Sequence, residues 1–214
     1  MIRKRRQLFS EIDIYPVISS KFTRGRTPQS VLSEVAEGGA RIVQMREKNL
    51  SKRALYELGC AFREICSRHN MLFIVNDHLD LALALNADGV HLGQDDLPLR
   101  AAREIAPELL IGVSTHSREE ALEAQAGGAD YINLGPIYPT NTKETGFSAL
   151  GEDFIRKLAP SLRIPFTVMG GIKARHIPLL LSLGASKIAM VTEISLADDI
   201  SQRVRELRCQ MLRN

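Results

Sequence analysis

The stretch LFIVNDHLDLALALNADGVHL, residues 72–92, decides the fold class of this chain. It holds two short apolar runs, at 72–75 and 89–92, on either side of a longer segment that we assign to a helix. Parallel strands need a crossover connection, and that connection is usually a helix. The stretch therefore predicts a strand, a helix and a second strand parallel to the first.

The same alternation continues in both directions along the chain. Short runs rich in Val and Ile alternate with longer segments of helical period, of which 52–68 is the clearest. We expect strands at residues 12–18, 41–45, 72–75, 89–92, 110–113, 131–134, 166–169 and 187–191. Eight strands with helices between them, in 214 residues, favour a closed (β/α)8 TIM barrel over an open sheet.

Small-residue turns that contain glycine precede four of these strands, at 38–40, 87–89, 127–130 and 184–186. Glycine adopts the left-handed backbone with which many helices end. These turns therefore predict the ends of helices, after which the chain turns back into the next strand of the sheet.

The composition is that of an ordinary globular protein, with 44% hydrophobic and 25% charged residues. We expect one domain over residues 1–214, with a flexible basic N-terminus over about residues 1–10 that includes Arg3, Lys4, Arg5 and Arg6. The formal net charge of +3 suits anionic small molecules and is too small to predict nucleic-acid binding.

The three cysteines, Cys60, Cys66 and Cys209, follow neither a metal-ligand spacing nor a redox CxxC spacing. No apolar run approaches the roughly 18 residues that a membrane span needs. We expect a cytoplasmic protein with reduced thiols and no membrane partner. Barrels often self-associate, so a homo-oligomer is compatible with the sequence.

Polar residues cluster directly after the apolar runs. They include the segments 44–48, 76–77, 94–96, 114–116 and 135–143. In a barrel these carboxyl ends of the strands converge on one face, and the active site is built there. The sequence therefore places a candidate site at this face.

The residue types in these segments suit an anion together with a hard cation. Arg46, Lys48 and Lys143 are suited to phosphate oxygens, which Arg grips with two donors and Lys approaches as a point charge. Asp77 and Asp96 offer the oxygen ligands that Mg2+ prefers when it bridges to substrate phosphates. Together they predict a magnesium-dependent diphosphate site, although an isolated Asp after a strand is more often a helix N-cap.

The last two strands suggest a second phosphate site. Loops after strands seven and eight of barrels often bind phosphate through backbone N–H groups. Gly170 and Gly171 would allow a close approach, and Thr192 would add a hydroxyl. Two phosphate sites imply two phosphorylated substrates and hence a group transfer.

Other chemistries find little support. His91 and His116 follow or lie in strands, where each is either a general acid or base or, more commonly, a packed and hydrogen-bonded side chain. There is no zinc spacing with two His and a carboxylate, no GxSxG elbow, and no GxGxxG after the first run.

Six motifs carry a resemblance to a known family. They are VQMREK (43–48), NDHLDLALALNADGVHLGQDD (76–96), IGVSTHS (111–117), ADYINLGPIYPTNTK (129–143), MGGI (169–172) and AMVTEI (189–194). In combination they closely resemble the thiamine phosphate synthases, which are (β/α)8 barrels related to the thiazole tautomerases. The resemblance spans about residues 15–195, nearly the whole chain.

The resemblance implies a transferase of an alkyl (pyrimidinylmethyl) group. It would condense 4-amino-2-methyl-5-hydroxymethylpyrimidine diphosphate with 4-methyl-5-(2-phosphoethyl)thiazole, or its carboxylated tautomer, to give thiamine phosphate and pyrophosphate. Arg46, Lys48, Lys143 and Ser114 would be catalytic, and Asp77 and Asp96 would hold Mg2+. The substrate-binding residues would be Gln44, Arg46, Lys48, Asn76, Ser114 and Lys143 for the pyrimidine diphosphate, and Thr140, Thr142, Gly171, Val191 and Thr192 for the thiazole phosphate.

The chain departs from the family pattern at two places. Met169 stands where a small or aliphatic residue is common, and Thr192-Glu193-Ile194 where Ser-Ala-Ile is frequent. Glu193 would weaken phosphate binding unless its carboxylate points away. The alternatives are a thiazole tautomerase or regulatory homologue on the same barrel, which would have no use for Asp77, Asp96 and Lys143 together, and a non-enzymatic phosphate sensor.

Overall fold

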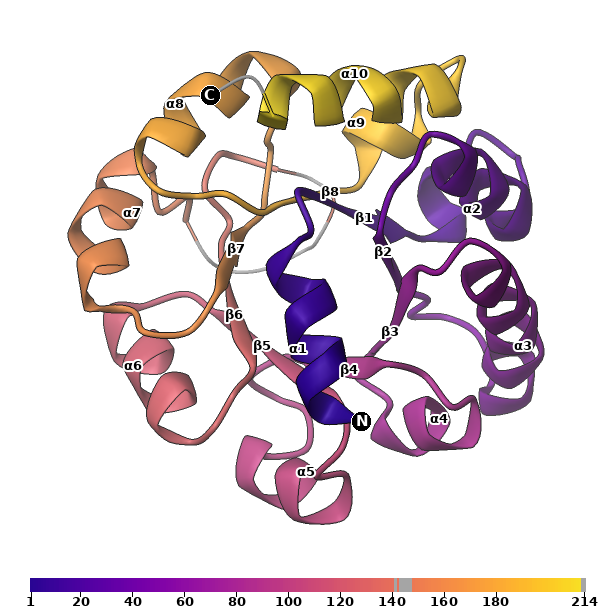
Figure 1. Cartoon of the computed structure of the whole chain (residues 1–214), viewed down its shortest axis with the longest axis horizontal. Helices are drawn as coiled ribbons and strands as arrows, with labels where there is room; N and C mark the ends of the chain where they lie inside the picture. Colours follow the sequence, from indigo (N-terminus) through magenta and orange to yellow (C-terminus); the bar gives the residue numbers. More distant parts are fainter. Residues whose placement is uncertain (141, 143–147, 213–214) are drawn as a thin grey trace.

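The computed structural model describes residues 1–140, 142 and 148–212 of the chain. In this part of the chain, eight parallel strands pair in sequence order, and the first pairs with the last to close a barrel (Figure 1). The strands are β1 (Ile14–Ile18), β2 (Ile42–Met45), β3 (Leu72–Asn76), β4 (Gly89–Leu92), β5 (Leu110–Thr115), β6 (Tyr131–Leu134), β7 (Phe166–Val168) and β8 (Ile188–Met190). The predicted (β/α)8 barrel is confirmed.

Helices surround the barrel and cover the outward face of its strands (Figure 1). The α-helices are α1 (Ile2–Ser10), α2 (Pro28–Glu37), α3 (Lys52–Arg68), α4 (Leu79–Ala84), α5 (Leu99–Ile105), α6 (Arg118–Ala126), α7 (Glu152–Leu158), α8 (Ile177–Ser182), α9 (Thr192–Ser195) and α10 (Ile200–Leu212). Short 3-10 turns are η1 (Ser20–Phe22), η2 (Ala159–Ser161) and η3 (Ala174–His176). Side chains of Thr27, Ser51 and Ser117 cap α2, α3 and α6 by accepting a backbone N–H of the first turn.

Alternate residues of a strand enter two different cores, as β6 shows. On β6, Ile132 and Leu134 belong to the large apolar core between strands and helices. Tyr131 belongs instead to a smaller cluster inside the barrel. This alternation is what a strand with period two gives when both faces of the sheet are covered.

The turns before the strands use the left-handed backbone as expected, with one difference. Gly39, Gly128 and Gly184 have φ values of 87, 88 and 88°. Before β4 it is Asn86, with φ 47°, that adopts this conformation, and Asn tolerates it better than most residues. Gly89 has another role, because a Cβ there would lie 2.5 Å from the carbonyl oxygen of Leu110 on β5.

The N-terminal segment differs from the flexible tail that we expected over about residues 1–10. It forms α1, which lies across one end of the barrel (Figure 1). Phe9 on this helix is 2% exposed and stacks on Tyr131 inside the barrel, with ring centroids 4.3 Å apart. The helix therefore closes the amino-terminal end of the barrel with an aromatic side chain.

The arginines of α1 are bound to the rim of the barrel. Arg6 Nε lies 2.6 Å from Asp130, and Arg5 Nε lies 3.4 Å from Asp88. Both carboxylates also accept a backbone N–H from a neighbouring strand, at Ile111 and Phe73. Arg5 and Arg6 of the basic N-terminus are thus paired with two acidic residues that immediately precede β4 and β6.

Among the described residues, no helix combines the length and the hydrophobicity required to cross a bilayer.

We expect Phe9→Ala to lower the free energy of unfolding by about 3 kcal/mol, because it empties a buried aromatic site and removes a ring stack. Urea denaturation of the whole chain measures this difference. Arg3→Ala on the exposed side of the same helix is the matched control and should change stability by less than about 0.5 kcal/mol. Equal effects of the two substitutions would contradict the role of α1 as the plug, by which we mean the helix whose Phe9 closes the amino-terminal end of the barrel.

Candidate functional site

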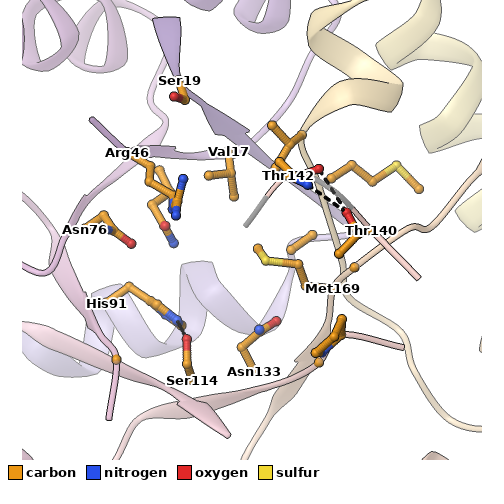
Figure 2. Close-up of a pocket in the computed structure, with 18 of the residues that line it drawn as sticks. Val17, Ser19, Arg46, Asn76, His91, Ser114, Asn133, Thr140, Thr142 and Met169 are labelled. Carbon is orange, nitrogen blue, oxygen red and sulfur yellow. Dashed lines mark hydrogen bonds between the residues drawn. The ribbon is translucent and has the colours of Figure 1, made fainter. Parts of the chain in front are cut away.

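A cavity of about 290 Å³ opens at the carboxyl ends of the strands. Side chains from the strands and the loops after them line it, as Figure 2 shows for residues such as Arg46, Asn76, Ser114 and Thr140. The described residues among those proposed from the sequence all line this cavity: Gln44, Arg46, Lys48, Asn76, Asp77, Asp96, Ser114, Thr140, Thr142, Gly171, Val191 and Thr192. Lys143 lies outside the described residues.

The loop after β2 brings two cations to the cavity. Arg46 is held by its backbone N–H, which donates to the carbonyl of Ile18 at 2.9 Å. Burial lowers the pKa of its guanidinium, while the nearby Asp77 and Glu47 carboxylates oppose that shift. A partly desolvated guanidinium gains more from an anionic ligand than an exposed one does.

Glu47, between the two cations, has a structural role. Its carboxylate is 8% exposed and accepts the Ser20 backbone N–H at 2.5 Å and the Ser20 hydroxyl at 2.7 Å. It therefore ties the loop after β2 to the loop after β1. Lys48 points the other way and forms an ion pair with Asp77.

The two carboxylates proposed as metal ligands lie beside each other. Burial and then the neighbouring Asp77 carboxyl raise the pKa of Asp96, although its bond from the Gly93 N–H, at 2.6 Å, opposes that shift. Asp77 has a φ of 64°, in the left-handed region that few non-glycine residues adopt and that Asp and Asn tolerate best. Two adjacent carboxylates repel each other, and Lys48 already pairs with one of them. Such a concentration of negative charge favours a bound cation.

Ser114 lies on β5, and its side chain points toward the cavity (Figure 2). Its Oγ is 2.9 Å from His91 Nε2, and its carbonyl accepts the Gln94 side-chain amide at 2.6 Å. Gln44 and Asn76 are buried at 2% and 8% exposure and line the same cavity from β2 and β3.

Two threonines approach the cavity from the loop after β6. Thr140 Oγ1 lies 3.0 Å from Thr142 Oγ1 and accepts the Thr142 backbone N–H at 3.2 Å. The start of this loop is attached to the end of β7, because Ile137 and Tyr138 donate their N–H groups to the carbonyls of Met169 and Gly170.

The paired glycines are required by that attachment. A Cβ on Gly170 would lie 2.5 Å from the Cβ of Pro136, and one on Gly171 would lie 2.5 Å from the carbonyl oxygen of Pro139. Both glycines have positive φ, at 101 and 63°. Their loop and the loop after β6 therefore pack as one unit, which lines the cavity together with Val191 and Thr192.

Glu193 does not leave an unbalanced negative charge beside Thr192. Its carboxylate pairs with Lys173 at 3.1 Å and with Arg203, and it accepts the Ala174 N–H at 3.1 Å. These contacts overcome the effect of burial and lower the pKa of Glu193. The carboxylate thus holds η3 and α10 near the end of β8, and it is neutralised by two cations.

Several cavity residues escaped the sequence analysis, among them Ser19, Glu120 and Asn133. Asn133 carried a usable signal, because it is a polar residue within an apolar strand and sits 6% exposed beside Thr167, whose hydroxyl donates to Asn133 Oδ1 at 2.8 Å. Glu120 lies on α6 and accepts the His116 N–H at 2.7 Å. The Ser117-x-x-Glu120 spacing at the start of this helix was a local signal for such a contact.

Comparison with known proteins agrees with this arrangement. Thiamine-phosphate synthase of Shouchella clausii is 41% identical over 199 residues, which cover 92% of this chain and 95% of that protein. The solved structure of thiamine phosphate pyrophosphorylase from Pyrococcus furiosus superposes with a TM-score of 0.86 at 36% identity, covering 97% of each chain. A 3-hexulose-6-phosphate synthase, at 19% identity and a TM-score of 0.67, shares the fold alone.

The family comparison covers most of the barrel. The sequence model described as thiamine monophosphate synthase matches residues 14–194, from the first residue of β1 to the third residue of α9. That range holds each of the cavity-lining residues proposed from the sequence. The chain belongs to the thiamine monophosphate synthase family.

Proposed function

We propose that this protein is a thiamine phosphate synthase, which joins a pyrimidine diphosphate to a thiazole phosphate and releases pyrophosphate. Family membership and relatives of about 40% identity named for this activity support the proposal. The observation that carries it is the division of the cavity. Arg46, Asn76 and the two carboxylates come from β2 to β4 and the loops after them, whereas Thr140 and the paired glycines come from the loops after β6 and β7. Figure 2 shows Arg46 and Asn76 on one side of the cavity and Thr140 on the other.

The side toward β2 to β4 is suited to the diphosphate. Arg46 and Lys48 supply positive charge, and Gln44, Asn76 and Ser114 supply amide and hydroxyl groups next to it. We assign these residues, together with Lys143 from the loop after β6, to the pyrimidine diphosphate. Arg46, Lys48, Lys143 and Ser114 would touch the departing group and are the catalytic residues of this proposal.

The opposite side is suited to the second substrate. Gly171 and Val191 present backbone next to the cavity, and Thr140, Thr142 and Thr192 present hydroxyls. We assign these residues to the thiazole phosphate. The Gly170–Gly171 loop and the described part of the loop after β6 pack as one unit, so these groups approach the cavity from one side.

The residues at the carboxylate pair fit a divalent metal ion, which we propose to be Mg2+. No group of three or more His, Cys, Asp or Glu side chains with metal-binding geometry occurs among the described residues. Asp77 and Asp96 would therefore provide two ligands and leave other positions to water and substrate oxygens, which is the arrangement that Mg2+ prefers. When bound, the ion supplies charge that neutralises the departing pyrophosphate.

The reaction is a substitution at the exocyclic methylene of the pyrimidine. The bond between the methylene carbon and the diphosphate oxygen breaks, and its electron pair leaves with pyrophosphate. The amino-pyrimidine delocalises the positive charge left on the methylene until the thiazole nitrogen forms the new carbon–nitrogen bond. Arg46 and Lys48 would stabilise the negative charge that develops on the departing group, and preorganised charge of this kind is usually the largest catalytic contribution.

Purified protein should release pyrophosphate only when it receives the pyrimidine diphosphate, the thiazole phosphate and Mg2+ together. A coupled pyrophosphate assay with each component omitted in turn, and with EDTA, measures this requirement. Release of pyrophosphate without the thiazole phosphate would indicate a hydrolase. Binding of the thiazole phosphate without any release would favour the tautomerase or the sensor.

Asp96→Ala should lower metal-dependent kcat/KM at least about 100-fold, because it removes one of the two proposed metal ligands. The remaining carboxylate, Asp77, would then be paired only with Lys48. Steady-state assays over a range of Mg2+ concentrations measure the loss. Asp153→Ala is the matched control, since Asp153 is an exposed carboxylate on α7 paired with Arg156. Near-normal turnover of the Asp96 variant would contradict the assignment of the metal ligand.

A further inference from the structure

A continuous series of hydrogen bonds crosses the barrel interior below the cavity. It begins at Gln44 Nε2, which donates to the Tyr15 hydroxyl at 3.1 Å. Tyr15 OH lies 3.0 Å from Tyr131 OH, which lies 3.1 Å from His91 Nδ1. His91 Nε2 reaches Ser114 Oγ at 2.9 Å, a contact drawn in Figure 2. Five strands thus contribute to one polar series that ends at a cavity residue.

The central part of this series is shielded from water. Tyr15 and Tyr131 are 1% and 0% exposed. The Tyr131 ring stacks on Phe9 and lies over Gly112, where a Cβ would be only 2.0 Å from the ring. Burial raises the pKa of both phenols. Each tyrosine therefore keeps one hydroxyl hydrogen, and a buried hydroxyl is costly unless that hydrogen is bonded.

The Gln44 amide sets the direction of the first hydrogen bond, and continuing in that direction is the arrangement in which every hydrogen of the series is bonded. A side-chain amide nitrogen only donates, so the Tyr15 oxygen accepts a hydrogen bond from Gln44. The Tyr15 hydroxyl then donates its own hydrogen bond to the Tyr131 oxygen. In this direction the Tyr131 hydroxyl donates to His91 Nδ1, 3.1 Å away, and the imidazole is neutral. A neutral imidazole that accepts at Nδ1 carries its hydrogen on Nε2.

The end of the series decides what Ser114 can do. His91 Nε2–H donates to Ser114 Oγ, so the serine oxygen is an acceptor inside the protein. Its own hydrogen is then directed elsewhere. Because Gln94 holds the Ser114 carbonyl and Ser114 lines the cavity, that hydrogen is available to a ligand in the cavity.

We propose that His91 and Tyr131 are positioning residues that hold the hydroxyl hydrogen of Ser114 toward an acceptor atom of the pyrimidine diphosphate. This rests on the function proposed above. Ser114 is then a hydrogen-bond donor to that substrate. It is neither a nucleophile nor a base, since a histidine that donates to Oγ cannot remove its proton.

A double-mutant cycle tests the coupling. Tyr131→Phe removes one hydroxyl and keeps the ring on Phe9 and Gly112. It should lower kcat/KM for the pyrimidine diphosphate by about 10-fold, the effect of one lost hydrogen bond. The KM for the thiazole phosphate should stay within about twofold. In a Ser114→Ala background the same substitution should have less than about a twofold effect, because its route to the substrate is gone.

The outcomes of the cycle separate positioning from general structural damage. A second full loss of about 10-fold in the Ser114→Ala background would overturn the proposal, because Tyr131 would then act independently of Ser114. Tyr56→Phe on the outer face of α3 is the matched control, since Tyr56 is 43% exposed and lies away from the cavity. It should leave all kinetic constants unchanged.

Nitrogen-15 NMR of the whole protein tests the direction of donation without any turnover. His91, assigned by its absence in His91→Asn, should show an unprotonated Nδ1 and a protonated Nε2, and Tyr131→Phe should shift this toward a mixture of tautomers. A protonated Nδ1 in the unmodified protein would overturn the proposal. If the unmodified protein releases no pyrophosphate, the proposed synthase function is refuted. The His91 tautomer measured by NMR would still show whether His91 donates to Ser114, so the two failures are distinguishable.

Discussion

Closure of the parallel sheet is the constraint on which the plug, the polar series and the cavity all depend. A closed barrel turns every second side chain of each strand inward and brings all carboxyl ends to one face. On β2, Ile42 fills the interior and Gln44 starts the hydrogen-bond series. On β5, Leu110 lies in the same interior cluster and Ser114 reaches the cavity. Packing and chemistry are therefore supplied by successive inward positions of the same strands.

Much of this arrangement could be predicted because it depends on local order along the chain. The apolar runs predict both ends of each strand to within two residues. The largest extension beyond a predicted end is at β5, which continues two residues past 113, to Thr115. Arg46 and Asp77 directly follow strands, and Asp96 lies in the loop after β4. Parallel pairing brings such positions to one face. The assignment of substrates to these residues stays a proposal, because neither the fold nor the family relation tests individual side chains.

The remainder could not be predicted because it depends on partners that are distant in the sequence. Arg5 and Arg6 resemble a solvated basic tail until Asp88 and Asp130 are placed beside them by the barrel. Lys48 is another case, since the sequence suggests only a phosphate ligand, whereas the structure pairs it with Asp77. Glu193 likewise looked unfavourable beside a phosphate site until Lys173 and Arg203 were seen to neutralise it.

The plug and the cavity meet at Tyr131. Phe9 covers one face of its ring and closes the amino-terminal end of the barrel, while the hydroxyl of the same residue belongs to the series that ends at Ser114. Water reaching the phenols from below would offer them other partners, and the direction of donation would no longer be fixed. Exclusion of water by α1 is thus a condition for an ordered hydroxyl at the opposite end of the barrel. Under the proposed function, a helix distant from the substrates would contribute to their recognition through the dry interior that it maintains.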